Sequence, residues 1–173
     1  LDDFIPVLVL NFDQVLRREF IAAVAPGRII NVHPSPLPAL RGPCPVFWAL
    51  AEDLVEAGVS LHLIEDENID TGPVLAQRSS PLDRKQSVAE TTEALFEQGA
   101  GLVPEVVRAL QAGQAVGRPQ DVARASYRGF PHRTDVARVR RAGVRLCRFK
   151  HLAKLLMKAV GVASAVSPPC AAP

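Results

Sequence analysis

A chain of 173 residues with 48% apolar and 22% charged residues has the size and composition of one ordinary globular domain, which excludes a disordered or fibrous protein. No apolar run approaches the roughly 20 residues that cross a bilayer, which excludes a membrane span. The acidic N-terminus lacks the basic start of a secretory signal. We therefore expect a soluble, cytoplasmic protein without membrane contact.

The net charge of +2 is divided unevenly along the chain. Residues 1–117 carry 8 Lys and Arg against 16 Asp and Glu, whereas residues 118–173 carry 12 against 2. Such a basic part can bind a polyanion, or it can form a solvated helix face or pack against the acidic part. The three cysteines, Cys44, Cys147 and Cys170, have no zinc-type spacing, so we expect free thiols and no structural zinc. Cys44 lies between two prolines and is expected to be a small buried residue.

The first predicted elements form a βαβ unit. Residues 5–10 are a continuous apolar run, typical of a strand that is buried on both faces of a parallel sheet. Apolar residues then recur at three- and four-residue steps over residues 12–24 and predict a helix that ends at Pro26-Gly27. Residues 28–32 predict a second strand, parallel to the first. Catalytic side chains belong at the carboxyl ends of such strands.

A loop with five prolines follows over residues 33–45 and predicts a stiff, irregular connection. Pro45 suits the first turn of the helix that comes next. The alternating residues 59–64 predict a strand, and residues 74–76 predict another after the polar loop EDENIDTG. Ser87-x-x-Glu90 is a capping box, which predicts the start of a long helix.

The pattern loosens beyond Gly113, and this change suggests the organisation of the chain. We divide it into a globular unit over residues 1–113, a short basic helical arm over 114–160 and a Pro/Ala-rich tail over 161–173 that we expect to be disordered. The arm contains two amphipathic pieces, near residues 134–142 and 150–160.

Polar side chains follow two of the predicted strands. Asn31 and His33 are two residues apart, so their side chains point the same way on an extended strand. Asp70 belongs to the acidic loop after another strand. Each has an ordinary explanation, because Asn, His and Asp near turns commonly satisfy backbone groups. His33, His62 and Asp70 could also form a metal site of two histidines and one carboxylate, but no HxH or HxxxH spacing supports it.

Taken together, the stretch NVHPSPLPALRG and the downstream DTGP resemble the N10-formyltetrahydrofolate-dependent formyltransferase family. The family signature is Asn-x-His-Pro-Ser-x-Leu-Pro-x-x-Arg-Gly followed by Asp-x-Gly-Pro, and the resemblance covers about residues 5–112. It implies an α/β fold with a Rossmann-like, mostly parallel sheet flanked by helices, here without the family's N-terminal strands and with an open sheet edge. Residues 1–113 would then be the C-terminal half of the catalytic domain.

The resemblance also implies an activity and a set of roles. The enzyme would move a formyl group from 10-formyltetrahydrofolate, as co-substrate, to an amine. Asn31 and His33 would stabilise the oxyanion, and Asp70 would position His33 and an ordered water for proton transfer. Ser35 has no partner base and receives no catalytic role. The further residues implied are His62, Glu65, Asp66, Glu67 and Ile69 on the folate side, and Arg41 and Gly42 on the substrate side.

Several functional alternatives remain open. The acceptor could be a tRNA-linked amino acid, as in methionyl-tRNA formyltransferases, a sugar nucleotide or another small amine. A formyltetrahydrofolate hydrolase would use the same Asn, His and Asp with water in place of the amine. A non-catalytic remnant that binds folate or nucleic acid through the basic arm is a third possibility. Residues 113–173 are too short and too poor in alternating strands for the tRNA-binding barrel of the methionyl-tRNA enzymes.

Overall fold

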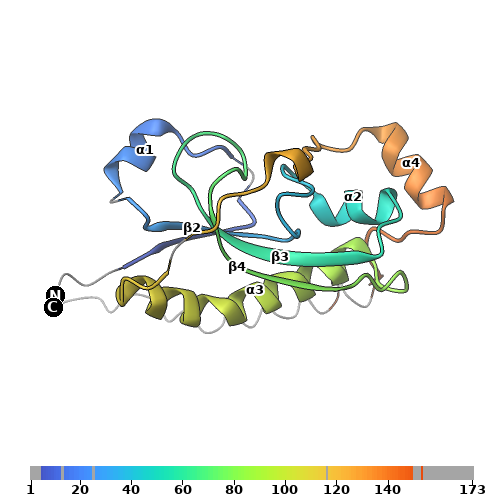
Figure 1. The fold of residues 1–173 in the computed structure, drawn as a ribbon. Coiled ribbons are helices and arrows are strands. Elements are labelled where there is room, and N and C mark those ends of the chain that lie inside the picture. The colour runs from blue at the N-terminus through green and yellow to red at the C-terminus, as the bar shows by residue number, and fades with distance from the viewer. Residues whose placement is uncertain (1–4, 13, 25, 116, 150–152, 154–173) are drawn as a thin grey trace, which may run out of the picture.

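The computed structural model describes residues 5–149 and 153, with the exception of residues 13, 25 and 116. A four-stranded sheet forms its centre, with helices on both faces (Figure 1). The elements in chain order are β1 (Val7–Leu10), α1 (Arg18–Ala23), β2 (Ile29–His33), α2 (Pro45–Ala51), β3 (Glu56–Leu63), β4 (Val74–Pro81), α3 (Val88–Gln111), the short 3₁₀ helix η1 (Val122–Arg124) and α4 (Arg133–Arg141).

The sheet has the order β1-β2-β3-β4 and is mixed. β1 and β2 are parallel, as predicted, but β3 is antiparallel to β2 and to β4. The α/β fold with flanking helices is confirmed, whereas a mostly parallel sheet is wrong for the described strands. The reason lies in the connection of residues 34–55, which leaves and re-enters the sheet at the carboxyl end of β2. The seven-residue α2 spans only about 10 Å at 1.5 Å per residue, so β3 starts at that end and runs back.

The N-terminal elements are less buried than the sequence predicted. β1 alternates between half-buried and exposed residues, and Leu8 and Leu10 are 40% and 44% exposed. The helix expected over residues 12–24 is reduced to α1, which has no buried residue. Phe12 and Val15 of the predicted apolar stripe are exposed. The described elements do not cover the apolar residues of β1 and of the segment before α1. These residues are therefore exposed at the β1 edge of the sheet.

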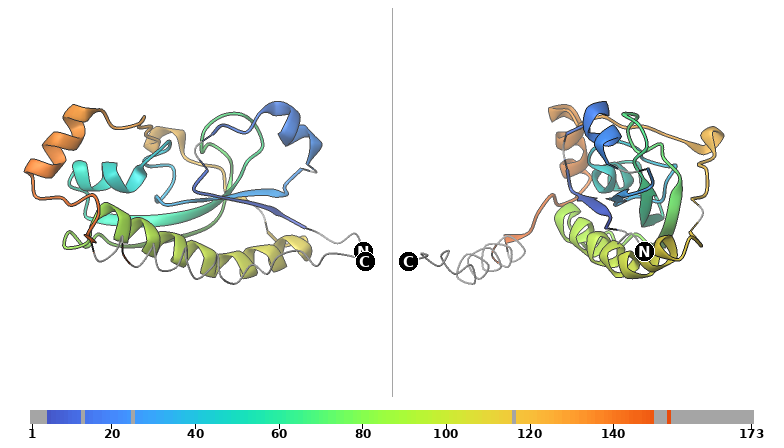
Figure 2. Two further views of the ribbon diagram at one scale, coloured as in Figure 1. Left: turned by 180° about the vertical axis from the view of Figure 1, so that it is seen from behind. Right: turned by 90° about the vertical axis from the view of Figure 1, so that its left-hand side faces the viewer.

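The core lies under β2 and β3, where α3 packs along one face of the sheet and α2 along the other (Figure 2). α3 begins with the predicted capping box, in which the Ser87 hydroxyl accepts from the Glu90 N–H and the Glu90 carboxylate accepts from the Ser87 N–H. Gly99 permits close approach of α3 to the sheet, because a Cβ there would lie 2.5 Å from a Val32 methyl. The most buried apolar side chains are Ile30, Val32, Val59, Leu61 and Leu95.

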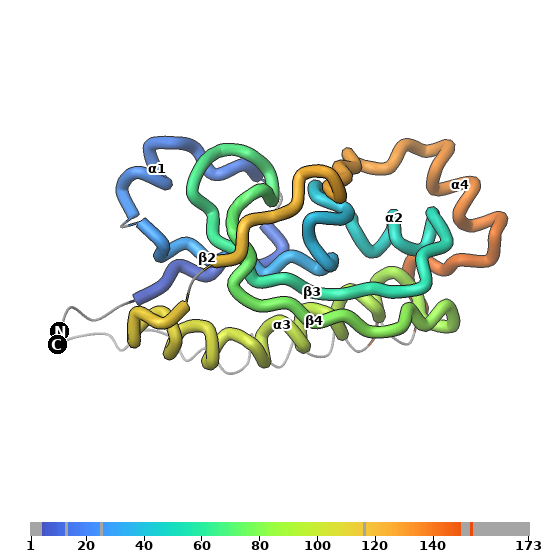
Figure 3. The backbone as a smooth tube through the Cα atoms, in the orientation of Figure 1, coloured from blue at the N-terminus to red at the C-terminus, as the bar shows by residue number. Residues whose placement is uncertain are grey.

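The chain after α3 runs back across the sheet toward α4 (Figure 3). We call residues 117–131 the bridging segment, because their backbone contacts two separate loops. Arg118 exchanges two hydrogen bonds of 2.9 Å with Val74, at the end of the 64–73 loop. Tyr127 pairs with Arg41, in the proline-rich loop. Part of the expected arm therefore packs on the globular unit.

The remaining expectations for the C-terminal part have mixed outcomes. The amphipathic piece near residues 134–142 forms α4, as predicted. The piece near residues 150–160 and the tail over 161–173 lie outside the described residues, apart from residue 153. The boundary at residue 113 stays a prediction. Within the part of the chain that the structure describes, no helix is long and apolar enough to span a membrane.

Candidate active site

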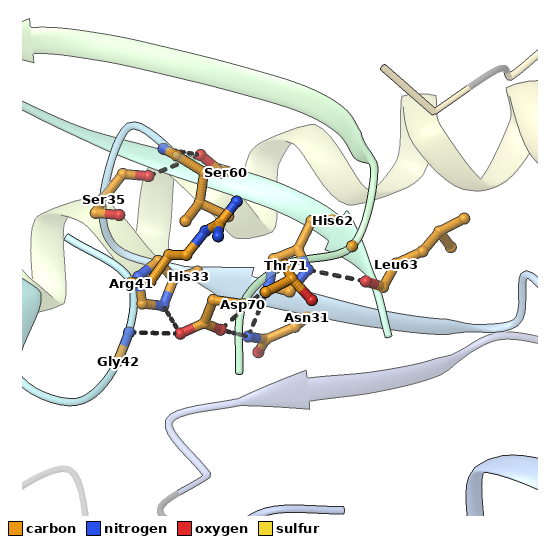
Figure 4. Close-up of polar contacts among 12 residues, drawn as sticks. Asn31, His33, Ser35, Arg41, Gly42, Ser60, His62, Leu63, Asp70 and Thr71 are labelled. Atoms are coloured by element: carbon orange, nitrogen blue, oxygen red, sulfur yellow. Dashed lines mark hydrogen bonds and ion pairs between the residues drawn. The ribbon is translucent and has the colours of Figure 1, made fainter. Parts of the chain in front are cut away.

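Asn31, His33 and Asp70 lie together at one cavity (Figure 4). The first two belong to β2, and Asp70 belongs to the loop over residues 64–73. β3 ends at Leu63, which lies beside Ile30 rather than at the carboxyl end of β2. The loop therefore folds back over the sheet to bring Asp70 to β2. This route differs from the predicted meeting of adjacent carboxyl strand ends, because the two strands are antiparallel.

The Asp70 carboxylate is the centre of the polar contacts. Its Oδ1 accepts a hydrogen bond of 3.1 Å from the Asn31 amide, and its Oδ2 accepts one of 2.9 Å from the Gly42 N–H. His33 Nδ1 lies 3.5 Å from Oδ2, and His62 Nε2 lies 3.3 Å from Oδ1. The Asp70 side chain is only 10% exposed, so these contacts are screened little by water. Two amide groups thus donate to one buried carboxylate, and two histidine nitrogens lie beside it.

The outer contacts of both histidines define which ring nitrogen carries the proton. His33 Nε2 lies 3.0 Å from the Leu40 carbonyl oxygen, and His62 Nδ1 lies 2.9 Å from the Leu63 carbonyl oxygen. A carbonyl oxygen only accepts, so each of these nitrogens must be the donor. In a neutral His33 ring the lone pair is then on Nδ1, the nitrogen that faces Asp70. His33 Nδ1 can therefore take up a proton beside the carboxylate.

Burial lowers the pKa of His33 below its ordinary value, although Asp70 and the Leu40 carbonyl act in the opposite direction. Burial alone would raise the pKa of Asp70, but its hydrogen bond with His62 and the neighbouring His33 outweigh that effect. The Gly42 N–H also favours the charged carboxylate, and the pKa of Asp70 lies below its ordinary value. Near pH 7 the site therefore holds an ionised Asp70 beside a neutral His33.

The cavity has a volume of about 570 Å³, within the usual range for small-molecule sites. One side is formed by the 64–73 loop, including Asp66, Glu67 and Ile69. The lining also includes Tyr127 and Phe130 of the bridging segment and apolar residues of the N-terminal part. Acidic groups of the loop and aromatic groups of the bridging segment thus both line the cavity that contains Asp70.

Comparison with known proteins identifies the family of the chain. Residues 3–107 match the family model described as formyl transferase. The chain belongs to the formyl transferase family. Over 128 residues it is 38% identical to the methionyl-tRNA formyltransferase of Roseiflexus sp. (strain RS-1), which is 74% of this chain and 39% of that protein. The chain thus spans about two fifths of the length of this curated relative.

Solved formyl transferases have the same fold. WlaRD, a sugar 3N-formyl transferase crystallised in the presence of dTDP and 5-N-formyl-THF, matches with a TM-score of 0.64 and 25% identity, over 75% of this chain and 45% of that chain. PseJ from Anoxybacillus kamchatkensis was solved in complex with UDP-4,6-dideoxy-4-formamido-L-AltNAc and tetrahydrofolate. It matches with a TM-score of 0.63 and 27% identity, over 75% of this chain and 67% of that chain. The predicted family and α/β fold are confirmed.

Two of the residues that the family resemblance implied lie away from the cavity wall. The Arg41 guanidinium donates to the Gln120 side chain instead of lining the cavity. Glu65 lines a second cavity of about 440 Å³, beside α1. Ser35 is a loop hydrogen-bonder, as expected, and donates to the Ala39 carbonyl at 2.8 Å. Cys44 was expected to be buried but is exposed. It has a left-handed backbone at the residue before α2, and it lines the cavity.

Other features of the candidate site become visible only in the structure. His33, His62 and Asp70 meet, yet no group of three His, Cys, Asp or Glu residues in the described ranges is arranged to hold a metal ion. Gln120, which contacts both Arg41 and the 64–73 loop, was missed by the sequence reasoning. It lies in a segment without regular periodicity, and no local pattern marks it.

Proposed function

We propose that this site transfers a formyl group from 10-formyltetrahydrofolate to an amine. The observation that carries the proposal is the buried Asp70 carboxylate, which lies 3.5 Å from His33 Nδ1 and 3.3 Å from His62 Nε2. Formyl transfer requires one group that takes a proton from the attacking amine and returns it to the leaving folate nitrogen. A neutral imidazole beside a fixed carboxylate has the required properties, and the family membership supports this reaction class.

His33 is the proposed proton carrier. The amine nitrogen attacks the formyl carbon and forms a C–N bond, and His33 Nδ1 accepts the proton that the amine loses, directly or through a water. The Asp70 carboxylate, 3.5 Å away, stabilises the resulting imidazolium. When the bond between the formyl carbon and the folate nitrogen breaks, the same proton passes to that nitrogen. His33 and Asp70 end the cycle in their initial states.

Asn31 is the proposed oxyanion donor. Addition of the amine turns the formyl oxygen into an oxyanion, which is stabilised by donors that are already in place. The Asn31 amide lines the cavity and donates to Asp70, and its nitrogen also lies 3.1 Å from His62 Nε2. An oxyanion would replace one of these two acceptors. The Nε2–H of His33 is engaged with Leu40, so the donor role predicted for His33 is less well supported than its role as a base.

The folate carrier is proposed to bind against the 64–73 loop. Asp66 and Glu67 line the cavity and offer carboxylate acceptors to a donor-rich ring, and Ile69 supplies apolar contact. His62 lies between this loop and Asp70. The folate compounds named for WlaRD and PseJ support a folate-derived donor. Because Glu65 lies at the second cavity, its part in this proposal is weaker.

The acceptor is proposed to be an amine carried by tRNA. The curated relative at 38% identity is a methionyl-tRNA formyltransferase, whereas the solved formyl transferases that act on sugars are 25–27% identical. The aromatic wall at Tyr127 and Phe130 is suited to an apolar aminoacyl side chain. A sugar nucleotide would instead stack its base on this wall.

The test is an assay of the full-length protein with 10-formyltetrahydrofolate and three acceptors: methionyl-tRNA, amino-sugar nucleotides and free amino acids. Formylated product and free formate are measured together. Formylated methionyl-tRNA above the level of an Asp70→Asn control supports the proposal. Formate release without any formylated amine would identify a hydrolase, and folate binding without either product would identify a binding protein.

A further inference from the structure

Gln120 connects the two loops that form the catalytic centre. Its side-chain NH₂ donates to the Asp70 carbonyl at 2.9 Å and to the Gly72 carbonyl at 2.7 Å. Its side-chain oxygen accepts two hydrogen bonds from Arg41, at 3.0 Å from Nε and 2.8 Å from Nη2. These four contacts use both donors and the acceptor oxygen of the amide. The orientation of the amide is therefore fixed, because carbonyls cannot donate and Arg cannot accept.

The backbone around Gln120 is anchored on both sides. On one side Arg118 pairs with Val74, just beyond the 64–73 loop. On the other side the backbone N–H of Arg41 donates to the Ser126 carbonyl at 2.9 Å, and the backbone N–H of Leu40 donates to the Ser126 hydroxyl at 2.9 Å. Leu40 is also the residue whose carbonyl holds His33. The bridging segment thus joins the loop that orients His33 to the loop that carries Asp70.

Asp70 has a backbone that needs such support. Its φ is +54°, in the left-handed region that non-glycine residues rarely adopt. Residues in such conformations persist where surrounding contacts hold them. The two carbonyls that Gln120 binds lie on both sides of Thr71, so this one amide fixes the turn from which the Asp70 side chain projects.

We propose that Gln120 is a positioning residue, which holds the Asp70 carboxylate at His33 and His62, and that Arg41 acts by orienting Gln120 rather than by binding substrate. This inference rests on the proposed function for its kinetic consequences. Gln120 is absent from the cavity lining, so its loss should affect the rate of transfer and not the affinity for the folate carrier. A displacement of a catalytic group by about 1 Å can cost about 10²-fold in rate.

Two variants of Gln120 test the proposal, with Gln114→Ala as the matched control at an exposed glutamine after the same helix. Gln120→Ala removes all four contacts. Gln120→Glu keeps the size and the contact with Arg41 but turns an oxygen toward the two carbonyls. We expect both to lower kcat by about 10- to 100-fold, with the KM for 10-formyltetrahydrofolate changed by less than about threefold. If Gln120→Ala does not fold, Gln120→Glu still provides the test.

A measurement independent of activity separates this inference from the proposed function. The groups that face His33 are Asp70, His62 and the Leu40 carbonyl, and Asp70 raises the pKa of His33. An NMR titration should therefore find the pKa of His33 lower in Gln120→Ala than in the parent, shifted toward its value in Asp70→Asn. In the Asp70→Asn background, Gln120→Ala should cause no further shift. A merely structural glutamine would shift the titration equally in both backgrounds.

The outcomes are distinct. A parent without formyl transfer overturns the proposed function, and the titration alone then decides the role of Gln120. An active parent whose kcat and His33 titration are unchanged in both Gln120 variants overturns the positioning role. A loss that appears mainly in folate KM would instead make Gln120 a binding residue and would overturn it as well.

Discussion

Asp70 combines an unfavourable backbone with an ionised, buried side chain. Each of its carboxylate oxygens receives one hydrogen bond from an amide and lies within 3.5 Å of one histidine nitrogen. No neighbouring carboxylate replaces it among the groups that the structure places in contact with His33. Burial disfavours a proton on His33, and the charge of this one side chain acts against that effect.

Replacing Asp70 by Asn retains the size but removes the charge. We expect the rate of formyl transfer to fall by about 10²- to 10⁴-fold, as is usual when a positioned acid-base group is lost. Folate affinity and melting temperature should change little, because Thr71-Gly72 still forms the turn. Steady-state kinetics, a folate-binding titration and a thermal melt measure the three quantities. Transfer at the parent rate would exclude Asp70 from the mechanism.

The lowered pKa of His33 predicts the pH dependence of the rate. The neutral ring is the form that accepts a proton, so the rate declines as pH falls through the pKa of His33 in the folded enzyme. Because burial holds that pKa below the ordinary 6.5, the acid limb of the rate profile should have its midpoint below pH 6.5. The measurement is kcat against pH. An acid limb with its midpoint above pH 6.5 would mean that another group carries the proton.

The residues that the sequence could predict are those with a local signature. Asn31, His33 and Asp70 belong to spaced motifs, and the two-residue step along a strand was sufficient to place the first two together. Arg41 was expected on the substrate side because the family resemblance implied that position. Its partner Gln120 lies 79 residues away along the chain. Because of this separation, the sequence could not indicate that the Arg41 side chain points toward Gln120.

At the scale of elements, the contact between α3 and the sheet depends on one small residue. A Cβ at Gly99 would lie 2.5 Å from Val32 Cγ1 and 2.8 Å from Val59 Cγ2, and both side chains are stiff and buried. A Cβ at Gly101, in the same helix, would meet nothing within 4 Å. The two glycines therefore offer a matched pair of positions.

We expect Gly99→Ala and Gly101→Ala to have effects of opposite sign. Gly99→Ala should lower the free energy of unfolding by about 1–3 kcal/mol, the usual cost of an overpacked core. Gly101→Ala should raise it by about 0.5–1 kcal/mol, because alanine is the better helix former. Urea denaturation measures both. Equal effects at the two positions would mean that α3 does not approach the sheet this closely.

Periodicity predicted most elements but not their directions. β2, α2, β3, β4 and the capped start of α3 were all anticipated from apolar pattern and turn residues. The antiparallel direction of β3 could not be predicted, because a strand that is buried on both faces has the same apolar pattern in either direction. The helix over residues 12–24 was predicted too long, because an apolar stripe indicates a face that can be buried and not that a partner covers it.

For the whole molecule, the uneven charge remains the main unexplained property. α4 carries Arg138, Arg140 and Arg141, all exposed, and only Val139 of this helix is buried. We predict that these arginines add salt-sensitive affinity for a phosphate-bearing partner, because bound cations release the partner's counterions. Neutralising all three to Gln should weaken tRNA binding and reduce its dependence on salt.

The control for this prediction removes the same charge from the acidic part of the chain. It replaces exposed arginines outside α4 by Gln, namely Arg17, Arg78 and Arg108. Fluorescence anisotropy with labelled tRNA at several salt concentrations compares the two triple variants. Equal slopes for the α4 variant, the control and the parent would show that α4 is structural.

The bridging segment has a consequence for the order of synthesis. The formyl transferase match ends at residue 107, and Asn31, His33 and Asp70 all precede that point. Gln120 and Ser126, which hold their two loops together, follow it. During translation the chemical groups therefore leave the ribosome before the residues that fix their positions. A nascent chain that ends before Gln120 would carry Asn31, His33 and Asp70 without the contacts that Gln120 and Ser126 make with their loops.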